Sequence, residues 1–103
     1  MRTFRQFFES ARIISESTKR IDELRKAIRG SRLVGDIARE QTRGFMVNVD
    51  CQDSNQPGTY EVTDTQQTNL TRFITLFNRD HKEKIDWNMP DSKQKQVYIY
   101  YVK

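Results

Sequence analysis

The start of the chain carries apolar residues three or four positions apart. This spacing places their side chains on one face of an α-helix. Thr3 followed by Gln6 fits a capping box, in which a threonine hydroxyl accepts a hydrogen bond from an early backbone N–H group. The pattern predicts an amphipathic helix of about four turns. Its apolar stripe consists of Phe4, Phe7, Phe8, Ala11 and Ile14.

A second helical stripe follows the polar residues 15–18. Apolar side chains at positions 21, 24, 27 and 28 continue the spacing, and Gly30 is placed to end the helix as a left-handed cap. The polar residues fit either a loop or the exposed face of one long helix. Beyond Gly30, the apolar positions between 33 and 38 predict a further short helix that begins at Ser31.

The period of the pattern changes after Gly44. Apolar residues at positions 45, 47 and 49 alternate with other side chains, which predicts a half-buried strand. Residues 56–59 have Pro and Gly at the central positions of a type II turn, and residues 60–62 resume the extended pattern. We therefore expect a β-hairpin between residues 45 and 62.

The pattern then predicts one more helix and one more strand. Residues 63–67 give overlapping helix-cap signals, and the amphipathic stripe after them predicts a helix that runs to about Lys84. Pro90 lies in the loop that follows. Residues 97–102 are apolar or aromatic on both faces, as expected of a strand paired inside a sheet or covered on both sides. The helical stripe consists of Leu70, Phe73, Ile74 and Phe77.

The predicted order is α, α, β, β, α, β, which is typical of an α+β fold. A boundary near residues 40–44 separates a basic amphipathic helical arm, residues 1–43, from a small ββαβ module, residues 44–103. A chain of 103 residues is the usual size of one domain, so we expect one compact unit overall. Because there is no apolar run of about 18 residues and no apolar block near the start, we expect neither a membrane span nor a secretory signal.

Positive charge is concentrated in the helical arm. The chain has 18 Lys and Arg against 14 Asp and Glu, with net +5 in residues 1–44, −3 in residues 45–80 and +2 in residues 81–103. Arginine outnumbers lysine 9 to 2 in the first segment, and guanidinium groups favour bidentate contacts with phosphate or carboxylate. A solvated helix face explains the same spacing. The candidate phosphate contacts are Arg20, Arg25, Arg29 and Arg32.

The sequence offers no group of residues suited to catalysis or metal binding. Cys51 and His81 are the only residues of their kinds, which excludes a zinc site within one chain. A nucleophilic pair needs these two residues to meet in space, and we interpret Cys51 as the end of a strand and His81 as the edge of a helix. No glycine-rich phosphate loop and no acid–base pair of carboxylates stands out. We therefore predict a non-enzymatic protein without a metal or cofactor.

Two further patterns have a simpler explanation. Residues 53–64 carry oxygen ligands at several positions of a calcium loop, but Pro57 and Asp64 depart from that loop, and a hairpin turn explains the same residues. Three tyrosines near three lysines match a base-stacking platform, whereas a buried strand is the interpretation that we favour for them. The tyrosines are Tyr98, Tyr100 and Tyr101, and the lysines are Lys93, Lys95 and Lys103.

The first eleven residues read MRTFRQFFESA. This opening resembles the leader of internal head proteins of T-even-type tailed phages, which begins with Met, a basic residue, Thr and an aromatic residue. In that family the leader directs a small, often basic protein into the assembling prohead, and the prohead protease cuts after a glutamate two residues beyond an aliphatic residue. Ile14 and Glu16, followed by Ser17, are similar to such a processing site.

The resemblance implies a small phage protein, either a virion or head-associated structural protein or an internal protein delivered with DNA. An amphipathic helix can lay its apolar face in a partner's groove, so we expect the first helix to dock on a capsid or scaffold protein, although it also fits packing onto its own sheet. The competing hypothesis is a host-takeover protein in the host cytoplasm that binds a host protein or nucleic acid through its arginine-rich helices. The docking residues are Phe4, Phe7, Phe8 and Ile14.

Overall fold

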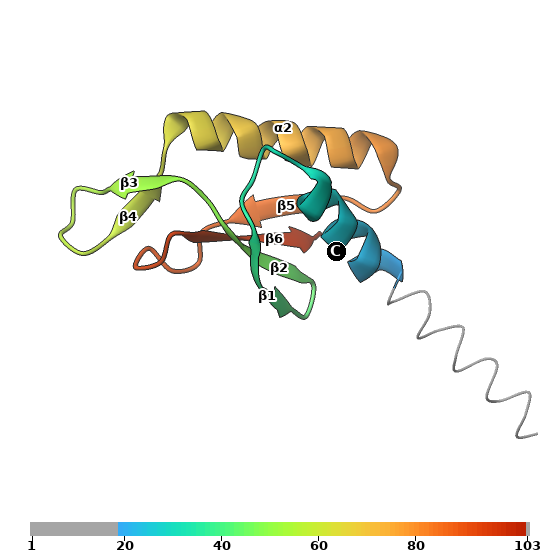
Figure 1. Cartoon of the computed structure of the whole chain (residues 1–103), viewed down its shortest axis with the longest axis horizontal. Coiled ribbons are helices and arrows are strands. Elements are labelled where there is room, and N and C mark those ends of the chain that lie inside the picture. Colours follow the sequence, from blue (N-terminus) through green and yellow to red (C-terminus); the bar gives the residue numbers. More distant parts are fainter. Residues whose placement is uncertain (1–18, 103) are drawn as a thin grey trace, which may run out of the picture.

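The computed structural model describes residues 19–102, which form an α+β fold and confirm the predicted class (Figure 1). Residues 19–30 are helical, and the long helix α2 spans Asp64–Asp80. The strands of this part of the chain are β1 (Ile37–Gln41), β2 (Gly44–Asn48), β3 (Cys51–Asp53), β4 (Tyr60–Val62), β5 (Ile85–Asn88) and β6 (Gln96–Tyr101).

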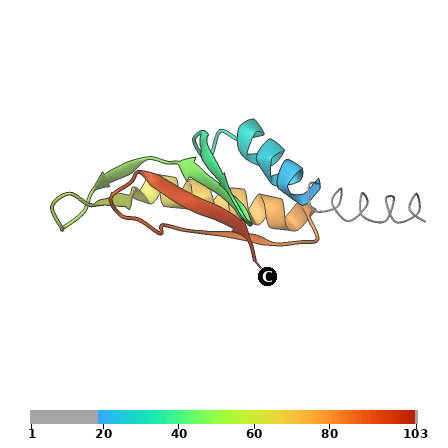
Figure 2. The ribbon, with the colours of Figure 1, turned by 90° about the horizontal axis from the view of Figure 1, so that it is seen from below.

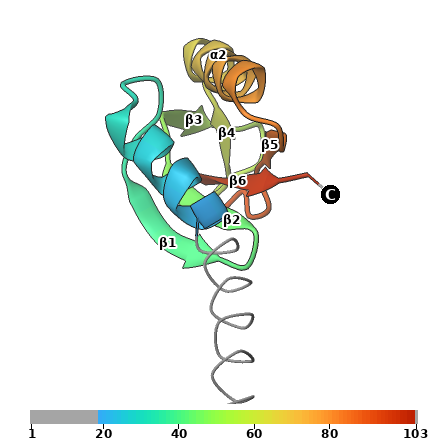
Figure 3. The same cartoon turned by 90° about the vertical axis from the view of Figure 1, so that its right-hand side faces the viewer.

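The main sheet is antiparallel and has four strands in the order β1-β2-β6-β5. Strands β3 and β4 form a separate two-stranded hairpin at the end of the molecule where α2 begins (Figure 1). Both described helices lie on the same side of the curved main sheet, as the end-on view in Figure 3 shows. In Figure 2, viewed from below, β6 lies in front of α2. We call the side of the main sheet away from these helices the outer face.

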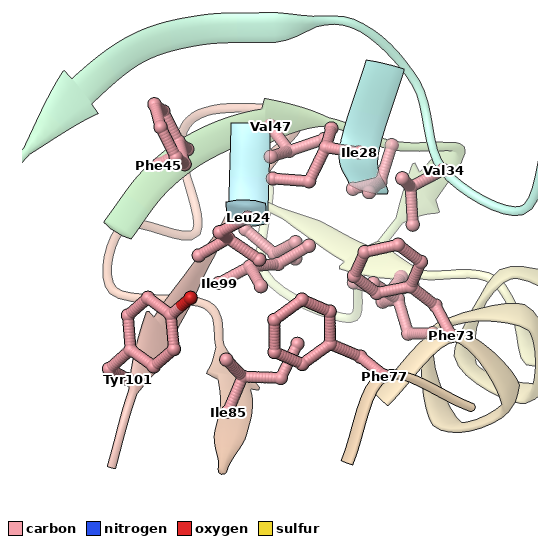
Figure 4. Packing of buried hydrophobic residues seen from close by; sticks show 14 residues of the cluster. Leu24, Ile28, Val34, Phe45, Val47, Phe73, Phe77, Ile85, Ile99 and Tyr101 are labelled. Atoms are coloured by element: carbon pink, nitrogen blue, oxygen red, sulfur yellow. The ribbon is translucent and has the colours of Figure 1, made fainter. Parts of the chain in front are cut away.

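The hydrophobic core fills the space between the main sheet and the helices. Leu24 and Ile28, one turn apart on the helix of residues 19–30, are at most 1% exposed and lie between strand β2 and helix α2 (Figure 4). Burying a side chain of this kind contributes about 1.5–3 kcal/mol. The helix of residues 19–30 is therefore part of the core. The side chains that surround it include Phe45 and Val47 from β2, Phe73 and Phe77 from α2, and Ile99 from β6.

The prediction of a short helix that begins at Ser31 is wrong. Residues 31–36 form bends and loop, and residues 37–41 form strand β1. The sequence of β1 contains Ala, Arg, Glu and Gln, which favour a helix, but the pairing of Glu40 with Phe45 and of Gln41 with Gly44 in β2 overrides that preference. Within the described residues the predicted helical arm therefore ends at residue 30, and the β1–β2 hairpin crosses the expected boundary.

Gly30 does not act as the predicted left-handed cap. Its φ is not positive, since Gly58 is the one glycine with a positive φ among residues 19–102. The helix instead ends with a tight hydrogen bond of 3.2 Å that the Ser31 N–H donates to the Ile28 carbonyl. The apolar residues after it still contribute to the core, because Val34 is buried there.

Strand β2 confirms the strand predicted after Gly44, but it lies inside the sheet and is buried on both faces. Phe45 and Val47 belong to the core on the helix side, whereas Met46 lies between them in sequence and is only 4% exposed. The partners of β2 are β1 and β6. The expectation of a half-buried strand paired with residues 60–62 is therefore wrong, because β2 has a strand on each side and β4 pairs with β3.

The predicted type II turn is confirmed at the tip of the β3–β4 hairpin. Gly58 has φ 79°, a conformation that favours glycine, and the Thr59 N–H donates a 3.2 Å hydrogen bond to the Gln56 carbonyl. This turn accounts for the Pro and Gly residues that also fitted a calcium loop. The ββαβ description of residues 44–103 omits β3, which precedes the turn, and β5, which follows α2.

Helix α2 and strand β6 confirm the two strongest sequence predictions. Thr63 is the N-cap of α2, and its hydroxyl accepts a 3.1 Å hydrogen bond from the Gln66 N–H. The helix ends at Asp80, one turn before the predicted Lys84. Strand β6 lies between β2 and β5, as expected of a strand paired on both sides. Among residues 19–102 no helix is long and apolar enough to cross a membrane.

Candidate functional site

A cleft lined with cationic side chains lies at the end of the main sheet where β6 finishes. It has a volume of about 600 Å³, and Tyr101 and Val102 form part of its wall. Its four cations come from three separate parts of the chain, and one carboxylate accompanies them. We call this surface the basic cleft. The cations are Arg20, Arg43, Lys82 and Lys84, and the carboxylate is Glu83.

The end of β6 holds two of these cations in place through the backbone. The Tyr101 N–H donates a 2.9 Å hydrogen bond to the Arg43 carbonyl in the β1–β2 turn. The Val102 N–H donates another of 2.9 Å to the Lys84 carbonyl, which immediately precedes β5. Arg43 and Lys84 are therefore fixed on opposite sides of the same strand.

Arg20 reaches the cleft from the helix of residues 19–30. Its guanidinium carbon lies 4.5 Å from the centre of the Tyr101 ring, a cation–π distance. The Tyr101 hydroxyl donates a 2.7 Å hydrogen bond to the Arg20 carbonyl, and the Arg20 side chain forms an ion pair with Glu83. Both side chains of this ion pair are about half exposed, so the pair adds little stability.

Lys84 also satisfies the C-terminal end of α2. Its Nζ atom donates hydrogen bonds to the carbonyls of Asn78, at 2.6 Å, and His81, at 3.1 Å. The last carbonyls of a helix have no partner within the helix and carry partial negative charge. His81 closes the same end, because its ring stacks on Phe77 at a centroid distance of 3.8 Å. These contacts fix the backbone that carries Lys82.

Arg43 and Lys82 supply positive charge that is free to bind an anionic ligand. Both side chains are exposed, and no ion pair within residues 19–102 includes either of them. Their charges are therefore not neutralised by a carboxylate of the described chain. An exposed arginine and lysine that converge on one cleft can both contact an anionic group such as a phosphate.

Tyr101 keeps a neutral hydroxyl beneath these cations. Burial, together with the negative charges of Glu23 and Glu83, raises the pKa of Tyr101 to about 12, while the charge of Arg20 acts in the opposite direction. The hydroxyl is therefore protonated at neutral pH and donates its hydrogen bond to Arg20 throughout the physiological range. The wall of the basic cleft contributes no negative charge from this residue.

The four arginines predicted to contact phosphate do not meet at one place. Arg20 lies in the basic cleft, whereas Arg25 forms ion pairs with Asp22 and Glu40, and its hydrogen bond to Glu40 raises its pKa. The guanidinium of Arg25 also lies over the Phe45 ring, 5.4 Å from its centre. The other two arginines, Arg29 and Arg32, are exposed, and their phosphate role stays a prediction.

The structure does not bring Cys51 and His81 together. Cys51 pairs with Val62, which precedes α2, and His81 follows the opposite end of this 17-residue helix (Figure 1). Burial raises the pKa of the Cys51 thiol, which disfavours the reactive thiolate. In the described part of the chain, no three His, Cys, Asp or Glu side chains are grouped to hold a metal ion.

Sequence reasoning missed Arg43, Lys82 and Lys84 as members of one site. Arg43 lies about 40 positions before the two lysines and the three residues belong to no motif, so the only signal was the positive charge of residues 81–103. The predicted docking and processing residues lie outside the described part of the chain. They are Phe4, Phe7, Phe8, Ile14, Glu16 and Ser17.

Comparison with known protein families, with characterised proteins and with solved structures finds no match for this chain.

Proposed function

We propose that this chain is a small non-enzymatic protein of a tailed phage that accompanies the phage DNA and binds nucleic-acid phosphates through its basic cleft. The convergence of four cations from three parts of the chain on one cleft carries the proposal. Glu83 offsets one of these four charges, and the remaining like charges repel one another, which reduces the stability of the folded state. A bound polyanion removes that repulsion.

The salt dependence of binding tests the proposed function. The wild-type protein is expected to bind a fluorescently labelled DNA oligonucleotide, with an affinity that falls steeply as salt rises, because each phosphate contact releases counterions. Arg43→Gln and Lys82→Gln should each weaken binding and reduce the slope of log K against log salt by roughly 0.7–0.9, the contribution of one phosphate. These two residues are chosen because they have no partner to lose within residues 19–102.

A matched control removes an equal charge elsewhere. Arg72 is exposed on α2 and lies outside the basic cleft, so Arg72→Gln changes the net charge by the same amount as Arg43→Gln. We expect Arg72→Gln to leave the salt slope unchanged. If all three variants weaken binding equally, the interaction reports net charge alone and the basic cleft is not its site. If the wild-type protein does not bind the oligonucleotide at low salt, the proposed function is wrong.

The phage-head part of the proposal rests on the opening residues Met1–Ala11, which resemble a prohead leader. It predicts that the protein is present in purified phage particles, where intact-mass measurement identifies its form. A particle-borne chain that begins at Ser17 supports delivery into the head, whereas a full-length chain in the particle supports a structural role. In the full-length chain, before any cleavage, Phe4, Phe7, Phe8 and Ile14 form the docking surface for a capsid or scaffold protein.

The second candidate function is that of a host-takeover protein which binds nucleic acid or a host protein in the cytoplasm. The exposed side chains of Arg29 and Arg32, outside the basic cleft, favour it, since they offer charge on a second surface. Absence of the protein from purified particles, together with its presence in infected-cell lysate, selects this alternative.

A further inference from the structure

The outer face of the main sheet carries a pair of tyrosines that the basic cleft does not use. Side chains alternate along β6, so Val97, Ile99 and Tyr101 point into the core while Tyr98 and Tyr100 point to the outer face. The first three are at most 2% exposed, whereas Tyr98 and Tyr100 are partly exposed. The described helices lie on the opposite side of the sheet (Figure 3).

The two rings form a stacked pair on this face. Their centroids are 4.9 Å apart and their planes differ by 21°. Tyr100 lies opposite Gly44 in β2, and Tyr98 lies opposite Met46. Because Gly44 has no side chain, the pair has no bulky neighbour on the β2 side next to Tyr100. A partly exposed pair of rings in a central strand is the kind of surface on which nucleobases stack.

Cationic residues lie on the β1–β2 side of the tyrosines. Arg43 of the basic cleft directly precedes Gly44, the partner of Tyr100, and Arg39 in β1 lies opposite Met46, the partner of Tyr98. The basic cleft therefore meets the tyrosine-bearing part of the sheet at residues 43 and 44, and Arg39 is in register with Tyr98.

The opposite side of the tyrosine pair is unsuited to phosphate. Asp86 in β5 pairs with Tyr100, and its carboxylate repels a phosphate group. Asn88, the partner of Tyr98 on the same strand, carries no charge. The charge distribution therefore places the backbone over β1 and β2 and the bases over β6.

We propose that the outer face binds single-stranded nucleic acid, with unpaired bases stacked on Tyr98 and Tyr100 and the adjoining phosphates held by Arg39 and Arg43. This inference rests on the proposed phosphate binding and specifies its ligand, because bases inside a duplex are not free to stack on a protein ring. The protein then discriminates single strands from duplexes by stacking and not by base-edge recognition.

The test compares two ligands that have the same phosphates. The full chain is titrated with a labelled oligothymidylate of 12 nucleotides and with an abasic strand of the same length, at one salt concentration. The wild-type protein should bind the oligothymidylate roughly 5- to 150-fold more tightly, the range expected for stacking of one base. The double substitution Tyr98→Leu with Tyr100→Leu should abolish this preference and leave the abasic affinity unchanged.

Two control variants separate stacking from folding. Tyr98→Phe with Tyr100→Phe keeps both rings and should retain the preference. Tyr60→Leu removes a tyrosine of the β3–β4 hairpin, outside the main sheet, and should also retain it. If the leucine double variant loses its cooperative unfolding transition, equal affinity of the wild-type protein for the two strands still overturns the inference.

The outcomes distinguish this inference from the function on which it rests. Equal affinity of the wild-type protein for the two strands overturns base stacking and leaves phosphate binding standing. No binding of either strand overturns both. A dimer that depends on the two tyrosines, seen by sedimentation without any preference for bases, assigns the outer face to a second copy of the chain and also overturns the inference.

Discussion

The Tyr101 hydroxyl donates a 2.7 Å hydrogen bond to the carbonyl of Arg20, a residue 81 positions earlier in the chain. The same tyrosine is 2% exposed and its ring lies beneath the Arg20 guanidinium. This contact joins the last strand of the main sheet to the helix of residues 19–30. It also places Arg20 beside the cations that follow α2. Tyr101 therefore both stabilises the fold and shapes the basic cleft.

Removal of this hydroxyl should weaken the fold by a modest amount. Tyr101→Phe keeps the buried ring but loses the hydrogen bond to the Arg20 carbonyl, which should lower the free energy of unfolding by about 1 kcal/mol. Urea denaturation measures this change. Tyr60→Phe serves as the control, because the Tyr60 hydroxyl forms no hydrogen bond with another residue of the described range 19–102. Equal stabilities of the wild-type and Tyr101→Phe proteins would contradict the role given to this bond.

Tyr101 should ionise only at strongly alkaline pH. A tyrosine in the unfolded chain ionises near pH 10, whereas burial raises the pKa of Tyr101 in the folded chain to about 12. The folded state favours the neutral form, so this contribution to stability is fully present below about pH 10 and is lost as the pH rises from 10 through 12. The difference between the tyrosinate absorbance curves of the wild-type and Tyr101→Phe proteins isolates this group. A difference curve with its midpoint near pH 10 would show that the hydroxyl is not buried.

Gly44 should tolerate no side chain. A Cβ atom at this position would meet the Ile99 carbonyl oxygen and lie 2.7 Å from the Tyr100 Cα atom, so β2 and β6 would have to separate. We expect Gly44→Ala to lower the free energy of unfolding by about 3 kcal/mol. Gly30→Ala is the matched control, since a Cβ atom there has no neighbour within 4 Å and the backbone φ is not positive. The control should be neutral or stabilising by up to about 1 kcal/mol.

Gln66 should stabilise the fold through a bridge between two loops. Its side chain is buried, accepts a 3.1 Å hydrogen bond from the Asp50 N–H and donates one of 2.8 Å to the Leu33 carbonyl. Gln66→Ala leaves both backbone groups without this partner and should cost about 1–3 kcal/mol in thermal or urea unfolding. Thr65→Ala, at an exposed position of the same helix turn, is the control and should change stability by less than about 0.5 kcal/mol.

The elements that sequence reasoning predicted correctly carry their own local signals. Helix α2 has both an N-cap residue and a long apolar stripe, and five of the six residues of β6 are of high strand preference. Gln66 was correctly placed in the cap region of α2, but its side chain does not complete a capping box, because it bridges Asp50 and Leu33 instead. That use depends on loops that only the folded chain brings near.

The elements that sequence reasoning missed owe their structure to distant partners. Strand β1 is composed of residues that favour helices and is extended because β2 lies beside it. Strand β5 has four residues, too few to show a period, and is defined by its pairing with β6. The basic cleft was missed for the same reason, because Arg20, Arg43 and Lys82 become neighbours only after the sheet has formed.

The proposed binding of nucleic acid is best tested by mapping the contact on the isotope-labelled full-length protein. Backbone amide NMR signals are followed during titration with the 12-nucleotide single strand at constant salt. Binding at both surfaces should give the largest shifts at Arg43, Lys82 and Val102 in the basic cleft, together with Tyr98 and Tyr100 on the outer face. Shifts confined to the exposed side of α2, or no saturable shift at any residue, would contradict it.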